Sequence, residues 1–136
     1  MWDLTTTALD TAKLRGATYA DARAMHIRQR DLTTKNGAVG NLAQSESIGI
    51  GIRVLANGAW GFASTDKLTR EGVSACAAQA VSIAKASAFA KRGDVKMVPE
   101  SAYIDSWQAP LQKDPFEIPL EVSLKNFLEN YILINS

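Results

Sequence analysis

The spacing of apolar positions changes several times along the chain, and each change predicts a different element. Residues 3–15 gather small and aliphatic side chains on one helical face, and Gly16 follows as a stop, so the pattern predicts a short opening helix. From Asp21 to Lys35 the spacing becomes a looser alternation, which is typical of a strand with one solvent-exposed face.

Two Asn-Gly pairs predict tight hairpin turns, because both residues tolerate positive φ. Asn36-Gly37 ends the first strand and starts a second one, which we expect to end near the polar residues 44–47. Asn57-Gly58 lies between two further alternating stretches. A two-residue turn there predicts a second hairpin.

Alternation sorts this second hairpin, residues 48–65, into two unlike faces. The first face carries aliphatic and small residues, namely Ile48, Ile50, Ile52, Val54, Ala56, Ala59, Gly61 and Ala63. The second face carries Gly49, Gly51, Arg53, Leu55, Trp60, Phe62 and Ser64. The first face is suited to receive a helix.

The strongest helical pattern covers residues 69–91, where valines and alanines form one stripe. A stripe of alanines allows the backbone of this helix to come close to a sheet. Gly61 and Ala63 leave room for the helix on the aliphatic face of the hairpin. We therefore expect this helix to dock there. Cys76 lies within the stripe and is expected to act as a small buried apolar group.

Four prolines follow Asp94 and predict an extended arm with one short strand around Tyr103 to Trp107. Residues 122–136 then return to helical spacing, with Tyr131 and Ile132 on the apolar face. We expect an α+β fold in which two helices pack on one face of an antiparallel sheet of four or five strands. The predicted division is a domain over 1–95 and an arm with a terminal helix over 96–136.

Charge and composition exclude several classes of partner. Fifteen Lys and Arg residues against fourteen Asp and Glu give a formal net charge of +1, without a basic cluster for nucleic acid or a membrane. The tightest run, Arg28-Gln29-Arg30, is interpreted as a solvated strand edge. A single cysteine, no signal-peptide pattern and no long apolar run predict a cytoplasmic protein.

Catalytic and metal-binding patterns are missing from the sequence. A zinc hydrolase needs at least three ligands, and the protein has one histidine and one cysteine. His26 lies beside Arg28 and is interpreted as a structural or surface residue. Gly49 and Gly51 precede a strand and not a helix, so they do not form a phosphate-binding loop. We assign no catalytic and no metal-binding residue.

Two features of the second hairpin face stay open at this point. Gly49 and Gly51 mark either a twist or bulge in the strand, or a close approach by another backbone or by the ring of Trp60. The face with Leu55, Trp60 and Phe62 is either a second core layer, covered by the arm and the final helix, or a contact face for another domain or subunit.

The run SIGIGIRVLANGAWGFASTDKLTREGV, followed by the alanine-rich helix, resembles the N-terminal domain of the TldD/PmbA proteins, also called modulators of DNA gyrase. The upstream ATYADARAMHIRQRDLTTKNGAVGNL fits the same pattern, so the resemblance covers about residues 4–95. The resemblance implies an intracellular peptidase that works as a two-subunit assembly, in which one subunit carries zinc on a histidine motif. That motif lies downstream of this domain, so zinc is implied for the full-length enzyme and not for this chain.

These observations support two hypotheses. The first is a non-catalytic N-terminal domain of a TldD/PmbA-type metallopeptidase that contributes scaffold, subunit contact or a wall of the substrate cleft. Its partner is then a second subunit or a downstream domain, and a peptide is the family's substrate. The second is a stand-alone module that binds a peptide or protein through Arg53, Leu55, Trp60 and Phe62.

Overall fold

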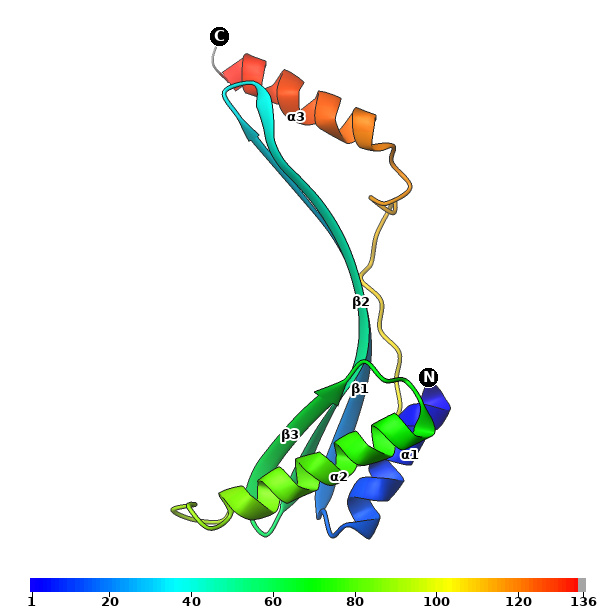
Figure 1. Ribbon diagram of the computed structural model, residues 1–136, viewed down its shortest axis with the longest axis vertical. Coiled ribbons are helices and arrows are strands. Elements are labelled where there is room, and N and C mark those ends of the chain that lie inside the picture. Colours follow the sequence, from blue (N-terminus) through cyan, green and yellow to red (C-terminus); the bar gives the residue numbers. More distant parts are fainter. Residues whose placement is uncertain (135–136) are drawn as a thin grey trace. The chain divides into compact units, whose positions relative to one another are not determined.

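The computed structural model describes the backbone of residues 1–134 and the side chains of residues 1–129 (Figure 1). The elements follow the order α1 (Trp2–Leu14), β1 (Tyr19–Lys35), β2 (Ala38–Ala56), β3 (Ala59–Thr65), α2 (Arg70–Ser87) and α3 (Leu120–Ile134). The strands form one antiparallel sheet in the order β1-β2-β3. The expected α+β class is therefore present.

The protein divides into two compact units. The first unit comprises residues 1–27 and 46–99, and the second comprises residues 28–45 and 100–136. The boundary that we expect between residues 95 and 96 stays a prediction. Within residues 1–134, no helix combines the length and the apolar content that crossing a membrane requires.

The sheet has three strands in the described part of the protein, so the expected four or five are not confirmed. Residues 38–56 form one continuous strand, because the polar residues 44–47 do not interrupt the extended backbone. Every residue from 38 to 47 is exposed, and a strand that meets solvent on both faces needs no apolar side chains. Residues 103–107 form no strand, and Tyr103 and Trp107 are exposed.

Both Asn-Gly pairs adopt the backbone that a two-residue hairpin turn requires. The φ angles are 52° at Asn36, 71° at Gly37, 51° at Asn57 and 72° at Gly58. The second turn sets the register of β2 against β3, which pairs residue 56 with 59, 55 with 60 and 53 with 62. This register is the one that a two-residue turn predicts.

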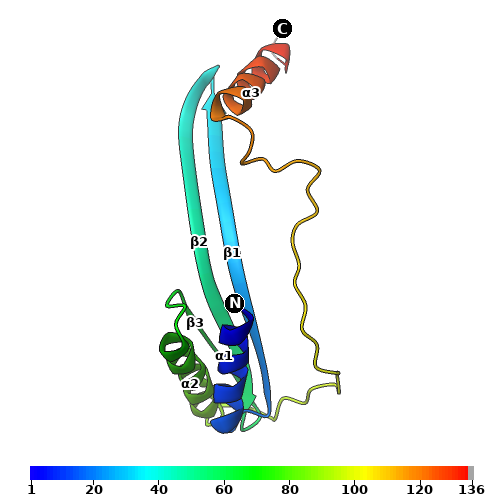
Figure 2. The same cartoon turned by 90° about the vertical axis from the view of Figure 1, so that its right-hand side faces the viewer.

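The core of the first unit lies between one face of the sheet and the helices α1 and α2, which are labelled in Figure 2. Small and aliphatic side chains from α1, β2, β3 and α2 form a single buried cluster: Ala8, Ala12, Ile50, Ile52, Val54, Ala56, Ala63, Val73, Cys76, Ala77, Ala80, Val81 and Ala84. The expected docking of the alanine stripe on this face is confirmed. Ile48 is the exception on the predicted apolar face, because 44% of it is exposed.

Gly61 determines how closely α2 approaches β3. A Cβ atom at this position would overlap the carbonyl oxygen of Ala80 and would lie 2.5 Å from the backbone nitrogen of Ala84. The helix backbone therefore rests directly on the strand. Thr69 caps the start of α2, where its hydroxyl accepts a hydrogen bond of 3.0 Å from the backbone N–H of Gly72.

The segment after α2 is bound to the second hairpin turn. Lys91 donates a hydrogen bond through Nζ to the carbonyl oxygen of Asn57, and its Nζ lies 2.7 Å from Oδ1 of Asp94. The backbone N–H of Val95 donates to the carbonyl oxygen of Gly58 at 2.9 Å. These contacts fix the start of the extended arm against the turn.

The final helix begins earlier than its spacing of apolar residues suggests. It starts at Leu120, two residues before the helical pattern begins. The side chains of Tyr131 and Ile132, which we expect on its apolar face, lie outside the described residues.

The contact at Gly61 yields the first prediction. Gly61→Ala should lower the free energy of unfolding by at least ~2 kcal/mol, because the helix must move away from the strand. Gly93→Ala is the matched control, since a Cβ there has no described atom within 4 Å. It should change stability by less than ~0.5 kcal/mol. Urea unfolding followed by circular dichroism measures both, and equal losses would contradict the close docking.

Candidate functional site

The candidate site is the sheet face that points away from the helices in the first unit, which we call the outer face. It is formed by six side chains from the three strands: Tyr19, Asp21, Arg53, Leu55, Trp60 and Phe62. The register of the second hairpin places Leu55 opposite Trp60 and Arg53 opposite Phe62. Directly opposed residues share a face of the sheet, so these four side chains are neighbours.

A network of polar and aromatic contacts orders the centre of the outer face. Arg53 donates to Oδ2 of Asp21 through Nε at 2.8 Å and lies within 2.7 Å of the same oxygen through Nη2. Its guanidinium carbon lies 5.0 Å from the centroid of the Trp60 ring, and Tyr19 meets that ring edge-on at 5.7 Å. The hydrogen bond to Asp21 raises the pKa of Arg53, which therefore stays charged.

The four residues that the sequence selects differ strongly in exposure. Leu55 is buried, with 6% exposed, and Trp60 is half-buried between its neighbours. Phe62 is 57% exposed and Arg53 is also exposed. The outer face is thus neither a full second core layer nor a uniformly open surface. Leu55 and Trp60 anchor it, whereas Phe62 and Arg53 are accessible to a partner.

Close approaches by other atoms explain Gly49 and Gly51 of β2. A Cβ at Gly51 would lie 3.1 Å from the ring of Phe62, so the ring covers this glycine. A Cβ at Gly49 would lie 3.2 Å from the carbonyl oxygen of Thr65. An aromatic ring does approach the strand, but it belongs to Phe62 and not to Trp60. Packing on a glycine holds the exposed ring in a defined position.

Alternation along β1 extends the accessible part of the outer face. Strict alternation along β1 would place Met25 and Ile27 on the same side of the strand as Tyr19 and Asp21. Met25 is 55% exposed and Ile27 is 46% exposed. Aromatic, methionine and arginine side chains are enriched in protein interfaces, and contiguous exposed apolar groups mark such surfaces. The outer face is chemically suited to bind another protein surface.

The described residues do not fit a metal centre. Among them, no group of three or more His, Cys, Asp and Glu side chains is placed to hold an ion. His26 is paired with Glu46, with Nε2 and Oε1 2.6 Å apart, on an exposed part of the sheet. Cys76 is buried, and its desolvation raises the pKa of the thiol, which opposes formation of a metal-binding thiolate.

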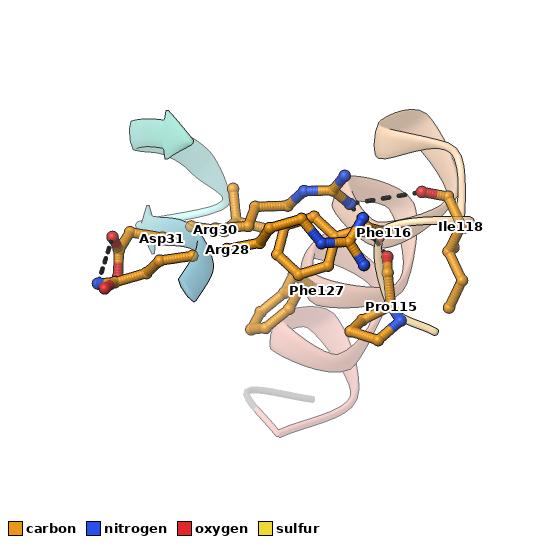
Figure 3. Close-up of a pocket in the computed structure, with 10 residues that line it drawn as sticks. Arg28, Arg30, Asp31, Pro115, Phe116, Ile118 and Phe127 are labelled. Atoms are coloured by element: carbon orange, nitrogen blue, oxygen red, sulfur yellow. Dashed lines mark hydrogen bonds between the residues drawn. The ribbon is translucent and has the colours of Figure 1, made fainter. Parts of the chain in front are cut away.

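A second candidate lies in the second unit, where a pocket of about 570 Å³ opens between β1, the segment around Phe116 and α3 (Figure 3). Arg28 and Arg30 extend together over the Phe116 ring, with guanidinium carbons 4.4 and 5.1 Å from its centroid. The interpretation of Arg28-Gln29-Arg30 as a solvated edge is wrong for Arg30, which is largely shielded. The sequence shows that Arg28 and Arg30 alternate along the strand. It does not indicate that their hydrogen-bond partners, Asp114 and Pro115, lie more than eighty residues away.

A comparison with known protein families gives a match that includes residues of both units. Residues 20–84 match the model of the PmbA/TldA metallopeptidase domain 1, which spans all of β3 and most of α2. This match includes Arg53, Trp60 and Phe62, and thus most of the outer face. The chain belongs to the PmbA/TldD family.

Two relatives support this assignment. The PmbA/TldD chain is 32% identical over 101 residues to a metalloprotease of Methanothermobacter thermautotrophicus, an alignment that covers 74% of this chain and 21% of the relative. It is 22% identical over 113 residues to a metalloprotease of Methanocaldococcus jannaschii, which covers 83% of this chain and 25% of the relative. The protein thus spans about a fifth to a quarter of the length of these relatives.

The unequal burial on the outer face of this PmbA/TldD domain predicts unequal effects of substitution. Trp60→Ala removes the edge contact with Tyr19 and the stacking with Arg53, and should cost about 2 kcal/mol of stability. Phe62→Ala removes a ring that is more than half exposed, and should cost less than ~1 kcal/mol. Urea unfolding by circular dichroism tests the difference. A larger loss for Phe62→Ala than for Trp60→Ala would place Phe62 in the folding core.

Proposed function

We propose that this protein is the non-catalytic first domain of a PmbA/TldD-type metallopeptidase. In this proposal its outer face contacts the remainder of such an enzyme or a second subunit, where it also contributes to a wall of the substrate cleft. The observation that carries the proposal is the ordered but accessible Phe62 beside Arg53, on the one sheet face that the described helices of the first unit leave open.

The family supports the enzymatic context, because both relatives are named metalloproteases. The metal and the hydrolytic groups belong, in this proposal, to parts of the enzyme beyond the matched region. A balanced net charge gives no support for direct contact with nucleic acid. The alternative of a stand-alone binding module is not favoured, because residues 20–84 match a metallopeptidase domain and both relatives are named metalloproteases.

The non-catalytic role predicts that the purified 136-residue protein lacks peptidase chemistry of its own. After incubation with Zn²⁺ and dialysis, elemental analysis should find well below one zinc per molecule. The protein should cleave a mixture of unfolded peptides no faster than buffer alone. Stoichiometric zinc together with hydrolysis that disappears in His26→Ala would overturn the proposal, because the activity would then depend on a residue of this domain.

The contact role predicts a specific effect inside a whole enzyme. In a chimera, residues 1–95 of this protein, which include the matched residues 20–84 and the control position Phe89, replace the corresponding region of the intact Methanothermobacter metalloprotease. There Phe62→Asp should lower the peptidase rate or the yield of assembled enzyme at least tenfold, because it places a charge in an apolar contact. Phe89→Asp is the matched control, since Phe89 is 94% exposed and lies after α2, away from the outer face. Equal behaviour of the two variants would argue against a contact at Phe62.

A further inference from the structure

The pocket in the second unit holds an arginine whose charge is incompletely matched. Two guanidinium groups, from Arg28 and Arg30, lie near one carboxylate, that of Asp114, but only Arg28 forms an ion pair with it. Arg28 binds this carboxylate directly, because its Nη2 lies 2.5 Å from Oδ2 of Asp114. The backbone N–H of Phe116 and the hydrogen bond from Arg28 lower the pKa of Asp114, so it is ionised and committed to this pair.

Arg30 has weaker partners. Its Nη1 donates to the carbonyl oxygens of Pro115 and Ile118 at 3.3 and 3.4 Å, which are long for hydrogen bonds of this kind. Its Nε is buried and has no partner among the described residues. A guanidinium offers five N–H donors in a rigid fork that matches a carboxylate. Arg30 therefore has N–H groups that no described residue binds, and a ligand can reach the shielded Nε only if the guanidinium shifts toward the pocket.

Asp31, an acid that lines the pocket, does not supply the missing anion. Asp31 follows Arg30 on β1, and Figure 3 shows its carboxylate pointing away from the Phe116 ring. Both of its oxygens accept hydrogen bonds from the side-chain amide of Gln29, at 3.2 and 2.9 Å. A shielded cation without a closely bonded carboxylate favours an anion from outside the protein.

The other residues that line the pocket indicate which chemical groups a ligand has besides its anion. Phe116 and Phe127 present aromatic rings, and Ile118 and Leu32 add aliphatic surface. A volume near 570 Å³ suits one or two amino-acid side chains and not a folded surface. A single incompletely paired arginine beside apolar walls matches one carboxylate, whereas nucleic acid requires several cations along a phosphate backbone.

We propose that this pocket binds a peptide carboxylate that lies beside an apolar side chain, with Arg30 as the main anion-binding residue. The carboxylate comes either from an Asp or Glu side chain or from the C-terminus of a peptide, because both present the same two oxygens to a guanidinium fork. The pocket shares no residue with the outer face, and binding requires no peptidase activity. Failure of this proposal therefore leaves the proposed function unchanged.

Titration of the 136-residue protein with short acetylated peptides tests the proposal. The first pair is Ac-Ala-Leu-Glu-Leu-Ala-NH2 and its Gln counterpart, and the second is Ac-Ala-Leu-Ala-Leu-Ala with a free or an amidated C-terminus. Isothermal calorimetry at low salt should show that at least one acidic peptide binds tenfold or more tightly than its neutral match. The pair that shows the difference identifies the source of the carboxylate. Equal affinities within both pairs, or no binding at all, would overturn the proposal.

Substitutions assign the binding to Arg30. Arg30→Gln should remove the preference for the acid, whereas Arg30→Lys should keep part of it, because the charge remains but the fork is lost. Arg23→Gln is the matched control, since this arginine is on the same strand, has a side chain 74% exposed and does not line the pocket. Circular dichroism checks that each variant is folded. A preference that persists in folded Arg30→Gln would also overturn the assignment.

Discussion

The direct contact between the backbones of α2 and β3 is the constraint on which the rest of the first unit depends. It exists because Gly61 has no side chain and because the facing turns of the helix carry only Ala80 and Ala84. Such a short separation fixes which face of the hairpin is inside. The larger side chains of the hairpin, Arg53, Trp60 and Phe62, are consequently left on the opposite face, and the accessible chemistry of the domain follows from that division.

The sequence predicts those features that depend on neighbouring residues. The turn at Asn57-Gly58 sets the register, and alternation then assigns each side chain of the hairpin to a face. The alanine stripe of α2 and the room at Gly61 are both visible as local patterns. For this part of the fold, local rules and tertiary packing favour the same arrangement.

The features that the sequence does not predict depend on partners that are distant along the chain. The polarity of residues 44–47 suggests the end of a strand. Polar residues are unfavourable in a strand only where one of its faces is buried, and both faces are exposed here. The stacking of Arg28 and Arg30 on Phe116 joins distant segments, so no periodic pattern in the sequence predicts it. The unequal burial of Leu55 and Phe62 likewise depends on surroundings, including β1, that the hairpin alone does not disclose.

The bonds between the second hairpin turn and the segment after α2 have a mechanical consequence. Val95 is joined to Gly58 by a backbone hydrogen bond, and Lys91 holds the carbonyl of Asn57. The arm that follows therefore starts from an anchored point and not from a freely fraying helix end. Separating the start of the arm from the hairpin turn would therefore require breaking the bonds made by Val95 and Lys91.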